Sequence, residues 1–168
     1  MEVLDLFPRS ILRGTLPAPL LNQLIDLGES VLANPSASPD ASAKLAGQLR
    51  QQRELRPDQP AVQQLSAEVL LPACDRWIRH VMDRQPPQGR GPWVPGRYRL
   101  QMIDLWINCQ TAGDYNPTHT HGGSFSGVIF LKVPPQITGN SFDGQLCFHG
   151  PEDWHLQSFR TGMAHYVL

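Results

Sequence analysis

A stretch rich in structure-breaking residues, RQPPQGRGPWVPG from Arg84 to Gly96, divides the chain into two parts with different hydrophobic periods. Before it, apolar residues recur at helical spacing, and after it apolar and polar residues alternate as they do in β-strands. Helices followed by a run of strands are typical of the α+β class. We therefore expect one structural domain, in which residues 1–96 form an N-terminal strand and helices and residues 97–168 form an antiparallel sheet or barrel.

Two helices are expected in the first part of the chain. Apolar residues at helical spacing predict them at Pro17–Leu32 and Ala61–Asp83, and Pro72 should kink the second helix or start a new turn. Between them, the Ser-, Ala-, Gln- and Pro-rich residues 34–60 predict a flexible connection, with one short helix around residues 41–52. A short extended segment is expected before the first helix.

The clearest strand signal is RYRLQMIDLWINCQ, residues 97–110, where the side chains alternate between two faces. The mostly apolar face should pack on the helices, and it comprises Gln101, Ile103, Leu105, Ile107 and Cys109. The other face mixes an aromatic ring with polar groups, as the wall of a binding cavity would, and it comprises Met102, Asp104, Trp106, Asn108 and Gln110. Further strands are expected at SGVIFLKVP, GQLCFHG and GMAHYVL.

Composition and termini narrow the functional classes. The 14 basic and 15 acidic side chains give a net charge of -1, which argues against a protein built to bind nucleic acid electrostatically. No apolar run reaches the roughly 20 residues of a membrane span, and the N-terminus lacks the pattern of a secretory signal. The three cysteines form no CxxC pair. We therefore expect a cytoplasmic protein with reduced thiols.

Two of the six histidines, His119 and His121, lie two residues apart in NPTHTHGGSFSGVIFLKVP. On an extended segment residues i and i+2 share a face, so the two imidazoles can converge on one metal ion. Glycines that permit close backbone approach follow the pair, and the facing strand offers polar groups that can order a metal ligand. The pair is therefore the candidate metal site, and two solvated surface histidines are the alternative.

The motifs around this pair resemble a family of iron(II)/2-oxoglutarate-dependent oxygenases. W-x-N at residues 106–108, Gly113 six residues before the first histidine, H-x-H, SGVIFLKVP and GQLCF follow one another as they do in that family. LFPRSIL near the N-terminus is similar to the family's opening strand. The resemblance implies a double-stranded β-helix, or jelly roll, with the N-terminal helices packed on its outer sheet.

The resemblance also implies Fe(II) as the metal and 2-oxoglutarate as co-substrate, which is converted to succinate and CO2 while a substrate is hydroxylated. His119 corresponds to the first iron ligand. His121 stands where related oxygenases place the carboxylate of the 2-His-1-carboxylate triad. Asn108, Gln110 and Ser126 are the candidates for contacts with the co-substrate.

The sequence departs from the family at its end, because the distal histidine and the 2-oxoglutarate-binding arginine do not follow before Leu168. We therefore expect an incomplete jelly roll without its third ligand, and an open sheet edge that permits pairing in a homodimer. His149, His155 and His165 are expected to face solvent or to support the fold.

The substrate is left open between a peptide, a nucleobase and a small metabolite. The alternatives to an oxygenase are a non-catalytic jelly-roll binding module and a cupin-like metal protein that does not use 2-oxoglutarate, because one barrel fold serves many functions.

Overall fold

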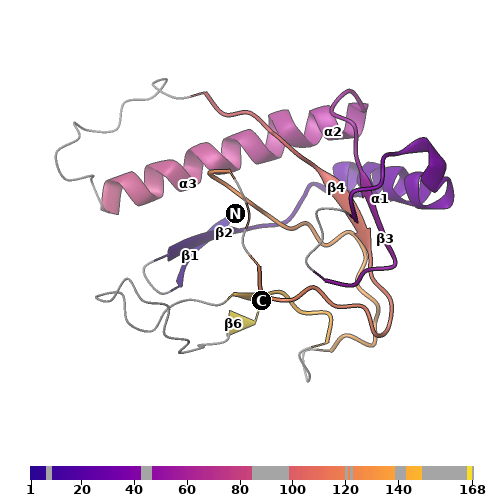
Figure 1. The fold of residues 1–168 in the computed structure, drawn as a ribbon. Coiled ribbons are helices and arrows are strands. Elements are labelled where there is room, and N and C mark those ends of the chain that lie inside the picture. Colours follow the sequence, from indigo (N-terminus) through magenta and orange to yellow (C-terminus); the bar gives the residue numbers. More distant parts are fainter. Residues whose placement is uncertain are drawn as a thin grey trace.

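The computed structural model describes residues 1–6, 9–42, 47–84, 99–119, 121, 123–138, 143–148 and 166–167. This part of the chain is an α+β structure, as expected, in which two-stranded antiparallel sheets accompany two long helical segments. In Figure 1 the N-terminal sheet lies alongside α3 (Leu71–Arg84), and the sheet that contains β4 (Trp106–Cys109) lies beside α1 (Ala18–Ala33). The described strands form three separate pairs, so a jelly roll is not formed by these residues.

The N-terminal extended segment is a hairpin. Strand β1 (Glu2–Leu6) pairs with β2 (Arg9–Arg13) in antiparallel register, with Leu6 opposite Arg9. The hairpin is attached to α3 (Leu71–Arg84) because the indole Nε1–H of Trp77 donates a hydrogen bond of 2.7 Å to the carbonyl oxygen of Ser10.

Helix α1 (Ala18–Ala33) confirms the first predicted helix, and a short helix η1 (Pro35–Ala37) follows it. The apolar stripe of α1 supplies two of the three residues at the centre of the core, Leu20 and Leu24. Leu65 of α2 (Pro60–Leu65) supplies the third. Each is at most 4% exposed. Burial of the two stripes against each other therefore holds α1 and α2 together.

The second helix is continuous but changes its hydrogen-bond spacing in the middle. The π segment η3 (Ser66–Leu70) joins α2 to α3 and ends just before Pro72. A proline inside an α-helix has no N–H to donate, and its ring crowds the carbonyl group four residues earlier. The wider π turn relieves this conflict, so the new turn expected at Pro72 takes the form of a π segment.

Residues 34–60 differ from the expected connection because they contribute a strand. Strand β3 (Gln51–Glu54) pairs antiparallel with β4 (Trp106–Cys109), and Gln52 lies opposite Asn108. The short helix predicted around residues 41–52 is therefore wrong at its end. Backbone hydrogen bonds to β4 outweigh the weak helical preference of this polar sequence, as tertiary pairing commonly does.

Of the long strand predicted over residues 97–110, residues 97 and 98 lie outside the described part, and within residues 99–110 the strand is limited to β4. Ile107 is 9% exposed and Leu105 packs against the core, so this face meets the helices as expected. The expectation is wrong for Ile103, which is 77% exposed, because no helix of the described part covers the segment there.

The strand predicted at SGVIFLKVP, residues 126–134, is wrong: the structure describes all of this segment and forms no strand there. Its alternation persists, because Ile129 and Leu131 pack against the core while Val128 and Phe130 remain exposed. The last two predicted strands contribute one short pair, β5 (Cys147–Phe148) with β6 (Tyr166–Val167). Within the described residues, no helix combines the length and apolar character needed to cross a membrane.

Candidate metal centre at the histidine pair

The loop after β4 is held in place by the carboxylate of Asp114. One oxygen of this carboxylate accepts hydrogen bonds from the backbone N–H of Thr111 at 2.8 Å, from the Thr111 hydroxyl at 3.1 Å and from the backbone N–H of Arg50 at 3.2 Å. These bonds, led by the one from the Thr111 backbone, lower the pKa of Asp114 below its ordinary value. Gly113 allows the sharp turn between them, since its φ of 90° is in the left-handed region.

The segment before β3 continues the pairing beyond β4 toward the histidines. Gln48 and Tyr115 exchange two backbone hydrogen bonds of 2.8 and 2.9 Å. Gly47 lies so close to the loop that a Cβ atom there would be 2.2 Å from the carbonyl oxygen of Tyr115 and 2.7 Å from Cδ of Pro117. Residues 47–54 therefore form a continuous support for β4 and for the loop as far as Pro117.

This support positions the first histidine. Nδ1–H of His119 donates a hydrogen bond of 2.7 Å to the carbonyl oxygen of Pro117. Because a carbonyl oxygen can only accept, the neutral imidazole carries its proton on Nδ1 and has a lone pair on Nε2. The backbone of the loop thus fixes both the ring orientation and the tautomer of His119.

The two histidines converge as the HxH spacing predicts. Nε2 of His119 lies 2.9 Å from Nε2 of His121, and the ring centroids are 4.7 Å apart. His121 also stacks on the indole of Trp106, with centroids 6.1 Å apart and an angle of 25° between the rings. Both histidines are exposed. The pair therefore lies at the surface, on the side of β4 that carries Trp106.

The separation of the two nitrogens fits two neighbouring positions around one metal ion. Metal–nitrogen bonds of about 2.1 Å that meet at a right angle place their nitrogens about 3 Å apart. The lone pair of His119 is already available, and His121 becomes a ligand when its proton is on Nδ1. Within the part of the chain that the structure describes, no group of three or more His, Cys, Asp or Glu side chains surrounds such a position.

The other predicted site residues are less closely joined to the pair. Asn108 shares its face of β4 with Trp106, whose ring stacks on His121, but no described contact links Asn108 itself to the pair. Gln110 and Ser126 are exposed, and no described contact links either of them to the pair. His149, His155 and His165 lie outside the described residues. Outside the predicted site, Lys132 makes an exposed ion pair with Glu29 of α1.

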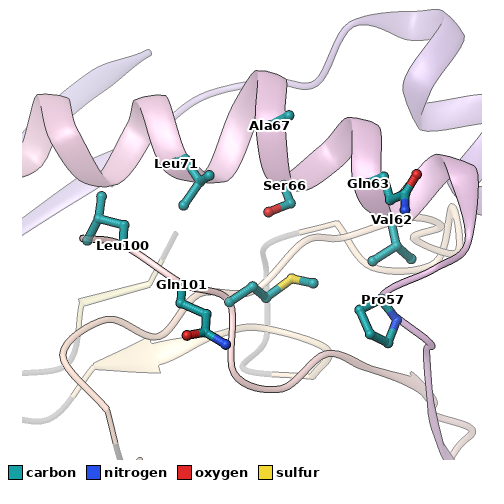
Figure 2. Close-up of a pocket in the computed structure, with 9 residues that line it drawn as sticks. Pro57, Val62, Gln63, Ser66, Ala67, Leu71, Leu100 and Gln101 are labelled. Atoms are coloured by element: carbon teal, nitrogen blue, oxygen red, sulfur yellow. The ribbon is translucent and has the colours of Figure 1, made fainter.

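A separate pocket of about 330 Å³ lies between the long helix and the segment that leads to β4 (Figure 2). It is lined by Pro57, Val62, Gln63, Ser66, Ala67, Leu71, Leu100, Gln101 and Met102. None of these side chains titrates near neutral pH or is a strong metal ligand. The pocket therefore offers no chemistry of its own, and the histidine pair remains the candidate site.

Two features near the histidine pair were not predicted from the sequence. The support formed by residues 47–54 has no apolar alternation, and only Gly47 and the neighbouring polar residues mark it. The burial of Gln52 was not predicted either: this residue is 3% exposed and projects to the same face of the sheet as Asn108. No pattern in the sequence distinguishes Gln52 from the other glutamines nearby.

One comparison with known proteins finds a family match, and the matched region contains the histidine pair. Residues 104–166 match the family model described as "Putative 2OG-Fe(II) oxygenase". The matched region begins next to β4 and includes the Asp114 loop, both histidines and β5. This match confirms the resemblance that the sequence motifs indicated. No curated protein and no solved structure matches the chain.

Proposed function

We propose that the chain is an iron(II)- and 2-oxoglutarate-dependent dioxygenase that hydroxylates a substrate, with its iron held by His119 and His121. The observation that carries the proposal is the 2.9 Å separation of the two Nε2 atoms inside the region that matches the oxygenase family. We further propose that the β3–β4 pair belongs to a jelly roll, as the family implies.

The chain contributes a positioned pair of nitrogen ligands. Pro117 holds the proton of His119 on Nδ1, and the ring of Trp106 restricts the rotation of His121. When bound, the iron would supply the activation of O2 and the oxidative decarboxylation of 2-oxoglutarate. We place the amide groups of Asn108 and Gln110 and the hydroxyl of Ser126 as hydrogen-bond donors to the carboxylates of the co-substrate.

A histidine in place of a carboxylate changes the charge of the site. Two neutral imidazoles leave the double charge of the metal uncompensated, whereas a carboxylate ligand would neutralise half of it. A dianionic co-substrate bound beside the two histidines would compensate this charge. Metal and 2-oxoglutarate should therefore bind with positive coupling, each raising the affinity of the other by the same factor.

The test is succinate formation from 2-oxoglutarate, measured in air and without O2, with and without added Fe(II). We expect succinate only when Fe(II) and O2 are both present, and no product from His119→Ala or His121→Ala. His80→Ala, which removes a histidine from α3, is the matched control and should retain the activity of the parent.

The alternative of another class is a cupin-like metal protein that does not use 2-oxoglutarate, and the succinate assay distinguishes the two. Metal binding that needs both histidines, without any succinate, would support that candidate. Absence of metal binding would instead indicate a non-catalytic binding module.

A further inference from the structure

Gln52 is a buried polar side chain with an unused hydrogen-bond acceptor. The residue is 3% exposed, and its side-chain oxygen Oε1 is buried without a hydrogen-bond partner in the described part of the chain. A buried acceptor without a donor lowers the stability of a protein, and an apolar side chain of the same shape would avoid that cost. The position of Gln52 therefore calls for a reason other than stability.

The register of the sheet places Gln52 on the side of the histidine pair. Gln52 lies directly opposite Asn108, and its diagonal neighbour is Trp106. Residues opposite each other in an antiparallel pair project to the same face, and diagonal neighbours are within reach of long side chains. Trp106 in turn stacks on His121. Gln52 thus shares one face of the sheet with the ring that supports the second histidine.

His121 has the complementary need for an acceptor. Its Nε2 faces Nε2 of His119, which has a lone pair, so His121 is the donor between them. A metal at Nε2 of His121 requires the proton to move to Nδ1, and metal-binding histidines almost always donate that second N–H to an oxygen. Pro117 provides the oxygen for His119, but the described structure provides none for Nδ1 of His121.

We propose that Gln52 is a positioning residue for His121: its side-chain oxygen accepts the Nδ1–H of His121 when the pair binds a metal ion. The inference rests on the proposed metal site and adds a residue to it. It explains why an acceptor is kept buried and unpaired in the metal-free protein, since its donor forms only when the tautomer of His121 changes.

The test compares Gln52→Met with Gln51→Met in the full chain. Methionine matches glutamine in length and shape but has no strong acceptor, so it removes the proposed bond without opening a cavity. Gln51 is the control because it neighbours Gln52 on β3 but projects to the other face, opposite Cys109. Binding of Zn(II) and Co(II) is measured by competition with a chelator, and Tm is measured without metal.

We expect Gln52→Met to weaken metal binding about 10- to 100-fold, the usual effect of removing such a supporting contact. We expect Gln51→Met to change the metal affinity less than about twofold, because the side chain of Gln51 projects to the other face of the sheet from Gln52 and Trp106. Metal-free Gln52→Met should have a Tm equal to the parent's or about 2–4 °C higher, since a buried unpaired acceptor is removed. A lower Tm together with weaker metal binding would indicate a structural role and would overturn the inference.

Nitrogen-15 NMR of the Zn(II)-loaded protein gives a second readout. The parent should show an exchange-protected Nδ1–H on His121, and Gln52→Met should lack this protection while His119 retains it. Unchanged metal affinity in Gln52→Met, with both histidines still required, would refute the role of Gln52 and leave the metal site intact. If the parent shows no histidine-dependent metal binding, the proposed function itself fails.

Discussion

Substituting alanine for Gly28 should test how closely α1 packs on the β3–β4 sheet. Gly28 is buried on α1, and a Cβ atom there would lie 2.4 Å from Cδ1 of Ile107 on β4. Carbon atoms pack at about 3.5–4.0 Å, so roughly 1 Å of movement is required. Overpacking of this kind costs about 1–3 kcal/mol, whereas replacing glycine by alanine in a helix gains about 1 kcal/mol. We expect Gly28→Ala to reduce the free energy of unfolding by about 0–2 kcal/mol.

The second substitution removes the conflicting atom. Ile107→Val lacks Cδ1 and should cost about 0.5–1.5 kcal/mol by itself. In that background the nearest remaining neighbour of the new Cβ is Cδ1 of Leu131 at 3.7 Å, which is an ordinary contact. Gly28→Ala should then stabilise the protein by up to about 1 kcal/mol. The change of sign amounts to a coupling energy of about 1–3 kcal/mol between the two positions.

The assay is urea denaturation of the parent, both single variants and the double variant, with Gly127→Ala as the control. A Cβ atom at Gly127 would have no neighbour within 4 Å among the described residues, so this substitution should change the free energy of unfolding by less than about 0.5 kcal/mol. Effects of Gly28→Ala and Ile107→Val that add within about 0.5 kcal/mol would refute the close contact between α1 and β4.

Three further predictions concern the core and the loop. Gly47→Ala should displace the loop at Tyr115 and weaken metal binding at least about tenfold, because ligand geometry tolerates shifts of only about 0.5 Å. Chelator competition measures the metal affinity, and an unchanged affinity would contradict this prediction. Leu65→Ala should lower the free energy of unfolding in urea by about 2–5 kcal/mol, since the side chain is 1% exposed; a loss below about 1 kcal/mol would place it outside the core. The Asp114 carboxylate has a lowered pKa, so its stabilisation should be fully present above the ordinary value of 3.8 and should be lost as the pH falls through the lower folded value. The stability difference between parent and Asp114→Asn should therefore be constant from about pH 5 to 8 and shrink in stronger acid, and a constant difference down to about pH 2 would be inconsistent with this.

The features that the sequence predicted correctly depend on local patterns. Apolar residues at helical spacing identified α1 and the second helix, and the i, i+2 spacing identified the convergence of the two histidines. Pro72 marked the disturbance in the long helix because its cause is local to the backbone. Local spacing also carried the resemblance that the matched region 104–166 confirms.

The features that it missed depend on contacts between distant segments. Gln51 and Gln52 have no apolar alternation, and they form a strand because β4, far along the chain, supplies backbone partners. Ile103 continues the alternation of its segment but lies where no described helix covers it. A buried, unpaired amide such as that of Gln52 follows from the register of the sheet and cannot be read from residue type.

The π segment before Pro72 affects the direction in which side chains point on either side of it along the long helix. Each residue of an α-helix advances the side-chain direction by about 100°, so one additional residue within a turn rotates everything that follows by about that angle. Leu65, before the insertion, faces the core with α1, whereas Trp77, after it, bonds to Ser10 of the hairpin. Deleting one residue from 66–70 would restore a regular helix and leave the indole pointing away from the hairpin. The added residue thus sets the rotation by which one continuous helix contacts both the core with α1 and the N-terminal hairpin.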